Sequence, residues 1–388
     1  MLPFLSKILT PFWGPFRLLD SYLVLLGIGS VLAMLLTHRL LPRFWGKLPQ
    51  DHGKALVKDG ELAKGKPTGA GFILVNIFCV VALLVMPFSW RMVGILICLY
   101  ACMLTGFMDD RSEKPWGQLK KGLLDVAISL GGAFVLCEGR PMQVWLPLFK
   151  GAGEGGSYTL SALAYIPIAG FILWVCINAV NCSDGVDGLA GSLSLLTLFC
   201  LGGFLYGITG HVRMAKYLLL PHYVDGARWA VLLYTACGML AGYLWYNAKP
   251  SMVMMGDAGS RFLGLLIGMA GLASGNPVMI LVVCPILLAD GGAGLVKLVL
   301  LRLLKKCGYD VRMPLRKVVN PIHPENFATD EEASRQIWLA RFIHSFRFPI
   351  HDLCRKELQW SDTQVLVRFM LLQAAITPIC TLLFIKLR

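Results

Sequence analysis

The sequence predicts an all-α integral membrane protein with ten transmembrane helices in one membrane-embedded domain, residues 1–388. Hydrophobic residues make up 56% of the chain, charged residues make up 15%, and the mean hydropathy is +0.65. Soluble domains are typically about 45–50% apolar and about 25% charged. The apolar residues are also gathered in runs close to the roughly 20 residues that a membrane-spanning helix needs. These observations exclude an ordinary soluble enzyme, a disordered chain and a collagen-like chain.

The ten apolar runs follow one another along the chain with short polar connections. They cover residues 21–41, 69–88, 91–108, 119–138, 159–180, 188–209, 227–246, 259–275, 277–303 and 364–386. The first run is too long, and too well flanked, for a cleaved signal peptide. We therefore expect each run to form one spanning helix.

The positive charges predict the orientation of these helices. Cytoplasmic loops of membrane proteins carry an excess of Lys and Arg, and the net charge here is +13. One rich loop, 42–68, carries Arg43, Lys47, Lys54, Lys58, Lys64 and Lys66. The other, 304–363, carries Lys305, Lys306, Arg312, Arg316, Lys317, Arg335, Arg341, Arg347, Arg355 and Lys356. Both loops fall on one side, which we expect to be cytoplasmic, with both termini outside and no role in nucleic-acid binding.

Two further features of the sequence need no catalytic or metal-binding explanation. The segment 304–363 is the long polar stretch of the chain, and we expect a small cytoplasmic subdomain or an inserted hairpin of helices there. Most of the twelve cysteines lie inside apolar runs, where Cys behaves as a small hydrophobic residue. No Cys/His spacing typical of a zinc site occurs.

Three acidic motifs interrupt this apolar pattern. They are Asp109-Asp110 after the third run, the segment 178–190 (NAVNCSDGVDGLA) between the fifth and sixth runs, and Asn247 with the segment 255–260 (MGDAGS) before the eighth. Carboxylates at a membrane boundary are costly unless they are paired or used. Each motif alone could also be a turn or a cap, because Asp and Gly suit tight backbone.

The predicted topology places all three motifs on the cytoplasmic face. Carboxylates suit Mg²⁺, which takes one or two protein carboxylates together with substrate phosphates and water. Glycines let the backbone approach phosphate oxygens, and Lys120 and Lys121 follow the first motif closely. The pattern favours phosphoryl transfer at a membrane surface, where catalysis is mostly positioning and charge stabilisation.

Taken together, the motifs resemble the polyprenyl-phosphate N-acetylhexosamine-1-phosphate transferases over almost the whole chain. This resemblance implies a ten-span enzyme that uses Mg²⁺. Such enzymes move a sugar-1-phosphate from a UDP-sugar to a polyprenyl phosphate and release UMP.

Further segments resemble the peptidoglycan branch of that family. They are 66–71 (KPTGAG), Pro349-Ile350-His351, Trp360 and Val367-Arg368-Phe369. The branch implies transfer of phospho-N-acetylmuramoyl-pentapeptide from its UDP-linked donor to undecaprenyl phosphate, which gives lipid I and UMP. It also implies the bacterial inner membrane as the location, and it leaves a homodimer as one option.

The resemblance assigns roles residue by residue. Asp257 is the expected Mg²⁺ ligand, with Asp184 beside it, and Asn181 and Asp184 line the metal and phosphate site. Asp109 and Asp110 are expected to be catalytic, and one of them would deprotonate the lipid phosphate. The remaining implied residues are Asp187 and Asn247 on the uridine side, Lys120 and Lys121 near the lipid phosphate, and the catalytic His351.

Some residues depart from the pattern and keep alternatives open. The triple His of the branch is here His351-Asp352-Leu353, and Met254 stands where an aromatic residue is expected. Asp290 resembles an acidic position of the related N-acetylglucosamine transferases. The first alternative is therefore the same chemistry with UDP-N-acetylglucosamine. The second, a cation-coupled transporter, would place acids near span midpoints rather than at span ends.

Overall fold

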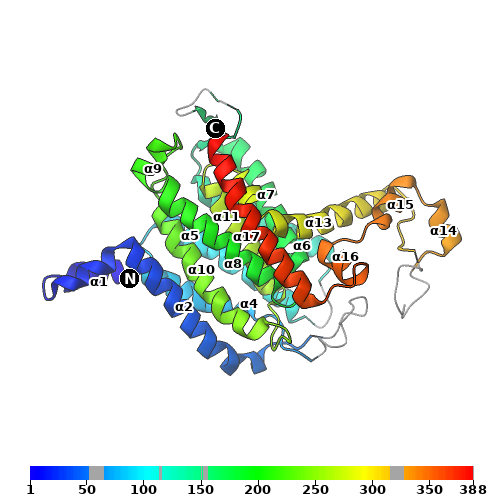
Figure 1. The fold of residues 1–388 in the computed structure, drawn as a ribbon, viewed down its shortest axis with the longest axis horizontal. Helices are drawn as coiled ribbons and strands as arrows, with labels where there is room; N and C mark the ends of the chain where they lie inside the picture. The colour runs from blue at the N-terminus through cyan, green and yellow to red at the C-terminus, as the bar shows by residue number, and fades with distance from the viewer. Residues whose placement is uncertain (52–64, 113–115, 150, 152–155, 315–326, 388) are drawn as a thin grey trace.

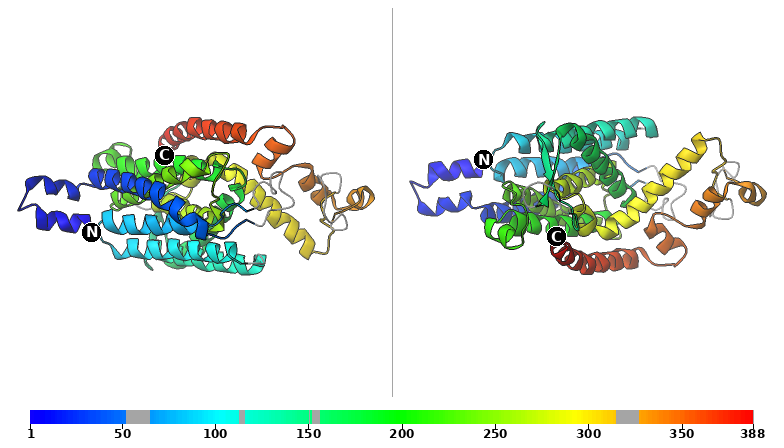
Figure 2. Two further views of the ribbon diagram at one scale, coloured as in Figure 1. Left: turned by 90° about the horizontal axis from the view of Figure 1, so that it is seen from below. Right: turned by 90° about the horizontal axis from the view of Figure 1, so that it is seen from above.

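The computed structural model describes residues 1–51, 65–112, 116–149, 151, 156–314 and 327–387, and it is mostly helical (Figure 1). Lys54, Lys58, Lys64, Arg316 and Lys317, which contributed to the charge count, lie outside the described residues. The chain begins with α1 (Leu2–Leu9) and a 3-10 turn, η1 (Gly14–Asp20). These two elements project from one end of the helix bundle (Figure 2).

The bundle itself is built from long helices that follow the predicted runs in order. They are α2 (Tyr22–Phe44), α4 (Gly71–Val85), α5 (Trp90–Asp110), α6 (Gln118–Cys137), α7 (Ala162–Ser183), α8 (Leu189–Phe204), α10 (Gly226–Asn247), α11 (Gly256–Ala273), α13 (Pro285–Lys306) and α17 (Asp362–Lys386). Shorter pieces extend three of them: η2 (Trp45–Lys47) after α2, the π-helical turn η4 (Leu205–Thr209) after α8, and α12 (Met279–Val283) before α13. A further short helix, α9 (Val212–Tyr217), follows η4.

The structure supports a multi-pass membrane protein, but the count of ten spans is not established. Within the described residues, six helical segments are long and apolar enough to cross a membrane. They are Tyr22–Lys47, Trp90–Asp110, Ala162–Ser183, Leu189–Thr209, Gly226–Asn247 and Asp362–Lys386. Helix α4 is apolar but has 15 residues, which at 1.5 Å per residue is about 22 Å, less than the roughly 30 Å hydrocarbon core.

One expectation from the sequence is wrong in detail. The run 277–303 is not one helix, because it breaks at Cys284 between α12 and α13. Pro285 explains the break, since proline lacks the N–H that a continuous helix needs and is suited to a first helical position. The mostly helical structure is consistent with the predicted all-α class and contains one short pair of strands among the described residues. The strands β1 (Met142–Val144) and β2 (Tyr158–Leu160) pair antiparallel between α6 and α7.

Helix α11 lies at the centre of the bundle and contacts α4, α5, α6, α7 and α8. Every residue from Ala258 to Ala273 is buried. Helix α4 approaches it very closely, because a Cβ atom on Gly71 would lie 2.1 Å from the backbone N of Gly259. This central position brings the acidic start of α11 against the ends of the neighbouring helices.

The described residues of the polar segment, 304–314 and 327–363, lie toward the end of the molecule opposite α1 (Figure 2). They contain the short helices α14 (Asp330–Arg335), α15 (Trp338–Ser345) and α16 (Ile350–Lys356). Lys297 Nζ in α13 donates a hydrogen bond to Phe346 O at 3.2 Å. The described part of this segment therefore contains short helices, of which α15 and α16 contact α13.

Candidate active site

Two carboxylates from different motifs share one ammonium group. Asp109 belongs to the last turn of α5, Lys121 to the first turn of α6, and Asp257 to the first turn of α11. Lys121 Nζ pairs with Asp109 Oδ2 and lies 3.3 Å from Asp257 Oδ2. The backbone N–H of Trp116 donates to the other oxygen of Asp109 at 2.8 Å. The structure thus brings the first and third motifs into one charged cluster.

The carboxylate of Asp110 has different hydrogen-bond partners from that of its neighbour Asp109. Its Oδ1 accepts a hydrogen bond from the backbone N–H of Asp257, and its Oδ2 accepts one from Ala258, each at 3.0 Å. Gly256, with φ +71°, makes room for this contact, since a Cβ atom there would lie 2.4 Å from Asp110 Oδ2. A carboxylate at a helix N-terminus is favoured by the exposed N–H groups and the helix dipole. Asp110 therefore anchors the start of α11.

Asn181, from the second motif, completes the cluster. Its Nδ2 donates to Asp257 Oδ1 and to Ser260 Oγ, each at 3.1 Å. Asp257 precedes the predicted span 259–275. Burial by itself would raise the pKa of its carboxyl group. The Lys121 charge and the Asn181 hydrogen bond outweigh burial, so the pKa is lower than for an ordinary aspartate. Asp257 consequently stays ionised at neutral pH.

The predicted uridine-side residues gather in an adjoining network. Asn247 Oδ1 accepts from the backbone N–H of Gly188, and its Nδ2 donates to Val253 O, both at 2.8 Å. Asp187 Oδ2 lies 3.4 Å from the backbone N–H of Ser251, and Lys66 Nζ donates to Ser251 Oγ at 3.2 Å. Asn247 thus ties the 184–188 turn to the segment that leads into Asp257.

Asp184 lies at the start of the same turn, and His351 of α16 packs against that turn. Asp184 is half-buried and follows directly after α7. His351 is buried, and its Nε2 would lie 2.4 Å from a Cβ atom on Gly185. Its partner is Asp290 of α13, whose Oδ2 lies 2.9 Å from His351 Nδ1. His351 therefore packs against the second motif rather than contacting the Lys121 cluster directly.

The two adjacent lysines separate clearly. Lys121 contacts the carboxylates, whereas Lys120 Nζ lies 3.4 Å from the centre of the Trp116 ring. Successive residues on an α-helix point about 100° apart, so the two lysines leave α6 in different directions. The sequence alone offers no signal that chooses between them.

Sequence reasoning missed the contacts of Asp290 and of the pair Asp125–Arg261. The sequence pointed to Asp290 through its resemblance to an acidic position of the N-acetylglucosamine transferases, and not through a contact with His351. Arg261, one helical turn after Asp257, pairs with Asp125 of α6, and both side chains are buried. The available signal in the sequence was that Arg261 is a charged residue inside the predicted span 259–275. Its partner lies 136 residues away, beyond the reach of local patterns.

The donor set fits a metal that substrate helps to bind. Within the described parts of the chain, no group of three or more His, Cys, Asp and Glu side chains could hold a metal ion by itself. Mg²⁺ usually takes one or two carboxylates and completes its shell with water and substrate phosphates. Asp257 already faces a cation, the Lys121 ammonium, so its surroundings accept positive charge.

The amino-acid sequence is similar to those of known proteins. Residues 92–275 match the family model for glycosyl transferase family 4. The chain is 39% identical to the phospho-N-acetylmuramoyl-pentapeptide-transferase of Treponema pallidum (strain Nichols) over 373 residues, 94% of this chain and 91% of the relative. It is 30% identical to the enzyme of that name from Campylobacter hominis over 73% of this chain and 81% of the relative. For Helicobacter pylori (strain J99) the values are 29%, 66% and 74%. By this similarity over nearly its full length, the chain belongs to the phospho-N-acetylmuramoyl-pentapeptide-transferase (MraY) family.

Proposed function

We propose that this protein transfers phospho-N-acetylmuramoyl-pentapeptide from its UDP-linked donor to a polyprenyl phosphate in peptidoglycan synthesis. An oxygen of the lipid phosphate attacks the phosphorus next to the sugar, the bond between the two donor phosphates breaks, and UMP leaves. The observation that carries the proposal is the Asp109–Lys121–Asp257 cluster, found in a chain 39% identical to a named transferase. Undecaprenyl phosphate is the proposed acceptor.

The geometry favours Asp109 over Asp110 as the base that removes a proton from the lipid phosphate. Both oxygens of Asp110 accept backbone N–H groups of α11, so Asp110 is already used in anchoring that helix. Asp109 shares Lys121 with Asp257, and the Lys121 ammonium is suited to hold the incoming phosphate. Asn181 fixes the orientation of Asp257, while Asn247 and Asp187 support the uridine side.

Mg²⁺ is the proposed cofactor, with Asp257 and Asp184 as its protein ligands. When bound, the metal supplies positive charge that stabilises the diphosphate and the departing UMP. Asp257→Asn keeps the size of the side chain but removes its charge, so UMP release should be abolished in a variant that remains folded. The matched control is Asp20→Asn, at the exposed end of η1. Substantial UMP release by Asp257→Asn, or full activity in excess chelator, would exclude this metal site.

The UDP-sugar that the protein uses as donor distinguishes the proposed transferase function from the alternative one. We expect UMP release at least about tenfold faster with UDP-N-acetylmuramoyl-pentapeptide than with UDP-N-acetylglucosamine, about 1.4 kcal/mol of transition-state discrimination. Arg and Lys of the segment 304–363 are the proposed partners of the peptide carboxylates. Equal rates, or faster release with UDP-N-acetylglucosamine, would assign the chain to the alternative. Release with neither donor would contradict the transferase function.

The bacterial inner membrane and a cytoplasmic site are further proposals. Gly117 next to Lys121 and Tyr217 of α9 are both exposed and offer labelling positions. In a cysteine-depleted background, Gly117→Cys should react with an impermeant thiol reagent only from the cytoplasm, and Tyr217→Cys only from outside. The opposite pattern would invert the topology. A homodimer is proposed as the assembly, and the mass of the purified particle would measure it.

A further inference from the structure

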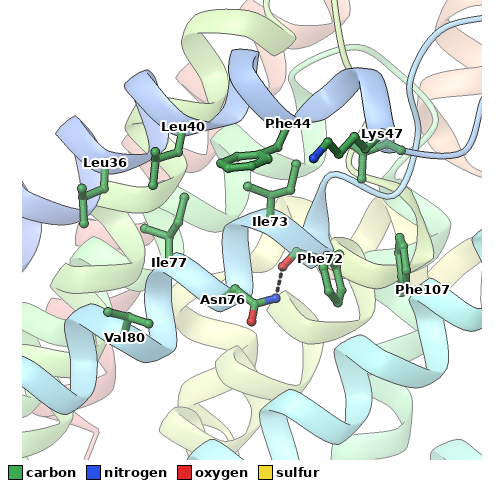
Figure 3. A pocket seen from close by; sticks show the side chains of 11 residues that line it. Leu36, Leu40, Phe44, Lys47, Phe72, Ile73, Asn76, Ile77, Val80 and Phe107 are labelled. Atoms are coloured by element: carbon green, nitrogen blue, oxygen red, sulfur yellow. Dashed lines mark hydrogen bonds between the residues drawn. The ribbon is translucent and has the colours of Figure 1, made fainter.

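An apolar groove of about 420 Å³ lies between α2, α4 and α5 (Figure 3). Leu36, Phe44, Ile73 and Phe107 are among its lining residues, and none of the carboxylates or lysines of the candidate active site lines it. Two polar residues, Asn76 and Lys47, also line the groove, and their side chains have different surroundings. The Asn76 amide is used within the bundle, donating to Phe72 O at 2.7 Å and accepting from Tyr100 Oη at 3.3 Å. Lys47 is exposed, and its Nζ lies 5.6 Å from the centre of the Phe44 ring.

The length and charge of the groove match one leaflet of a membrane. From Leu36 to Lys47 the helical chain rises about 16 Å, close to half of the roughly 30 Å hydrocarbon core. Lys47 stands at the end where the chain enters the Lys-rich loop 42–68, the expected cytoplasmic side. The cytoplasmic leaflet carries anionic lipids, which attract lysines at this depth. An acyl chain beside α4 would therefore place its phosphate at Lys47.

The inner wall of the groove rests on the backbone that supports the active site. The Phe72 and Phe107 rings are stacked with their centres 4.5 Å apart. A Cβ atom on Gly69 would lie 3.3 Å from Phe107 and 3.4 Å from Asp110 Oδ2. Two residues on, the backbone N–H of Gly71 donates to Met255 O at 3.0 Å, just before the start of α11. Pressure on the two rings thus reaches Asp110 and the start of α11.

We propose that this groove binds one acyl chain of an anionic phospholipid, with the lipid phosphate at Lys47. The bound chain supports Phe72 and Phe107 and so steadies the 69–71 segment behind Asp110. The acceptor lipid is not the occupant we propose, for three reasons. The Asp109–Lys121–Asp257 cluster does not line the groove, and Asp110 turns both oxygens toward α11. A polyprenyl chain of undecaprenyl length would also extend far beyond one leaflet.

Lipid cross-linking tests the site without any need for transferase activity. The full chain in nanodiscs is photolysed with phosphatidylglycerol that carries a diazirine on its acyl chain, and the labelled peptides are identified. Label should fall on α2 and α4. Ile73→Trp fills the groove and should remove most of this label, while Leu35→Trp, on an exposed face of α2 outside the lining, should keep it.

Charge recognition is tested by a second pair of variants. Wild type should retain phosphatidylglycerol about fivefold better than phosphatidylcholine, as expected for one lysine at an anionic surface. Lys47→Gln should lose this preference, and Arg39→Gln, an exposed α2 residue that does not line the groove, should keep it. UMP release by wild type should be faster in phosphatidylglycerol nanodiscs, and Lys47→Gln should not respond to the lipid.

Several results would overturn the proposal. They are label outside α2, α4 and α5, undiminished label in a folded Ile73→Trp, and an unchanged lipid preference in Lys47→Gln. Loss of the label on adding polyprenyl phosphate would assign the groove to the acceptor instead. Equal UMP release in both lipids would contradict the support of the 69–71 segment. If the chain released no UMP with any donor, the labelling result would still stand, so the two proposals fail separately.

Discussion

Asp290 in α13 holds His351 in α16 by two contacts. Its Oδ1 accepts a hydrogen bond from the backbone N–H of His351 at 2.8 Å, and its Oδ2 lies 2.9 Å from His351 Nδ1. Both residues are buried, with exposed fractions of 0% for Asp290 and 4% for His351. The ring consequently turns its Nε2 toward Gly185 in the second motif. Asp290 therefore holds the imidazole of His351, a residue that the sequence predicts to be catalytic, in a fixed orientation.

We expect Asp290 and His351 to act as a unit. Asp290→Asn and His351→Gln should each slow UMP release, mainly through kcat, and the double variant should be no slower than the slower single one. Contacting residues typically show coupling of about 0.5–3 kcal/mol in such a cycle. Asp352→Asn is the matched control, because Asp352 is adjacent and pairs with Lys356 at 3.0 Å. Additive effects of the two substitutions would contradict the coupling.

Lys121, rather than Lys120, should be required for turnover. Lys121→Gln leaves Asp109 and Asp257 facing each other without their shared ammonium. Lys120→Gln loses a contact with the Trp116 ring, worth about 0.5–1 kcal/mol at an exposed site. UMP release under saturating donor should fall at least about tenfold further in Lys121→Gln, which corresponds to about 1.4 kcal/mol. A larger loss in Lys120→Gln would show that the cluster is wrongly assigned.

The contact of α4 with α11 should not tolerate a side chain at Gly71. A Cβ atom there would lie 2.1 Å from Gly259 N, and overpacking of this kind typically costs about 1–3 kcal/mol. Gly71→Ala should lower the thermal midpoint and the activity together. Gly131→Ala on α6 is the control, since a Cβ atom there meets nothing within 4 Å. Comparable midpoints for the two variants would refute the close approach.

The buried pair of Asp125 and Arg261 should be costly to break on one side only. Removing one partner of a buried ion pair typically costs about 3–5 kcal/mol, whereas replacing both by apolar residues is often neutral or stabilising. We expect Asp125→Leu and Arg261→Leu each to lower the thermal midpoint in detergent, and the double variant to recover most of the loss. A double variant as unstable as the sum of the singles would argue against the pairing.

Much of the architecture was predictable because burial in a membrane demands apolar runs. All ten predicted runs lie on helices, although only six segments within the described chain meet the length and hydropathy of a span. The run 277–303 misled the prediction, since hydropathy does not report the backbone break before Pro285. The number of membrane spans was the least predictable feature. Helix α11 is buried against other helices of the protein, and it can therefore contain the charged residues Asp257 and Arg261.

For the candidate site, the sequence determined the residue types and the motif spacing, from which the transferase chemistry was inferred. Only the tertiary structure decided which side chains meet. It placed Lys121 rather than Lys120 between the carboxylates, turned Asp110 onto the start of α11 and joined Asp290 to His351. The physical reason is that these contacts, apart from the one between Lys121 and Asp109, join residues about 60 to 150 positions apart. Local patterns specify the helices, whereas the rotation and packing of those helices decide which side chains come within hydrogen-bonding distance.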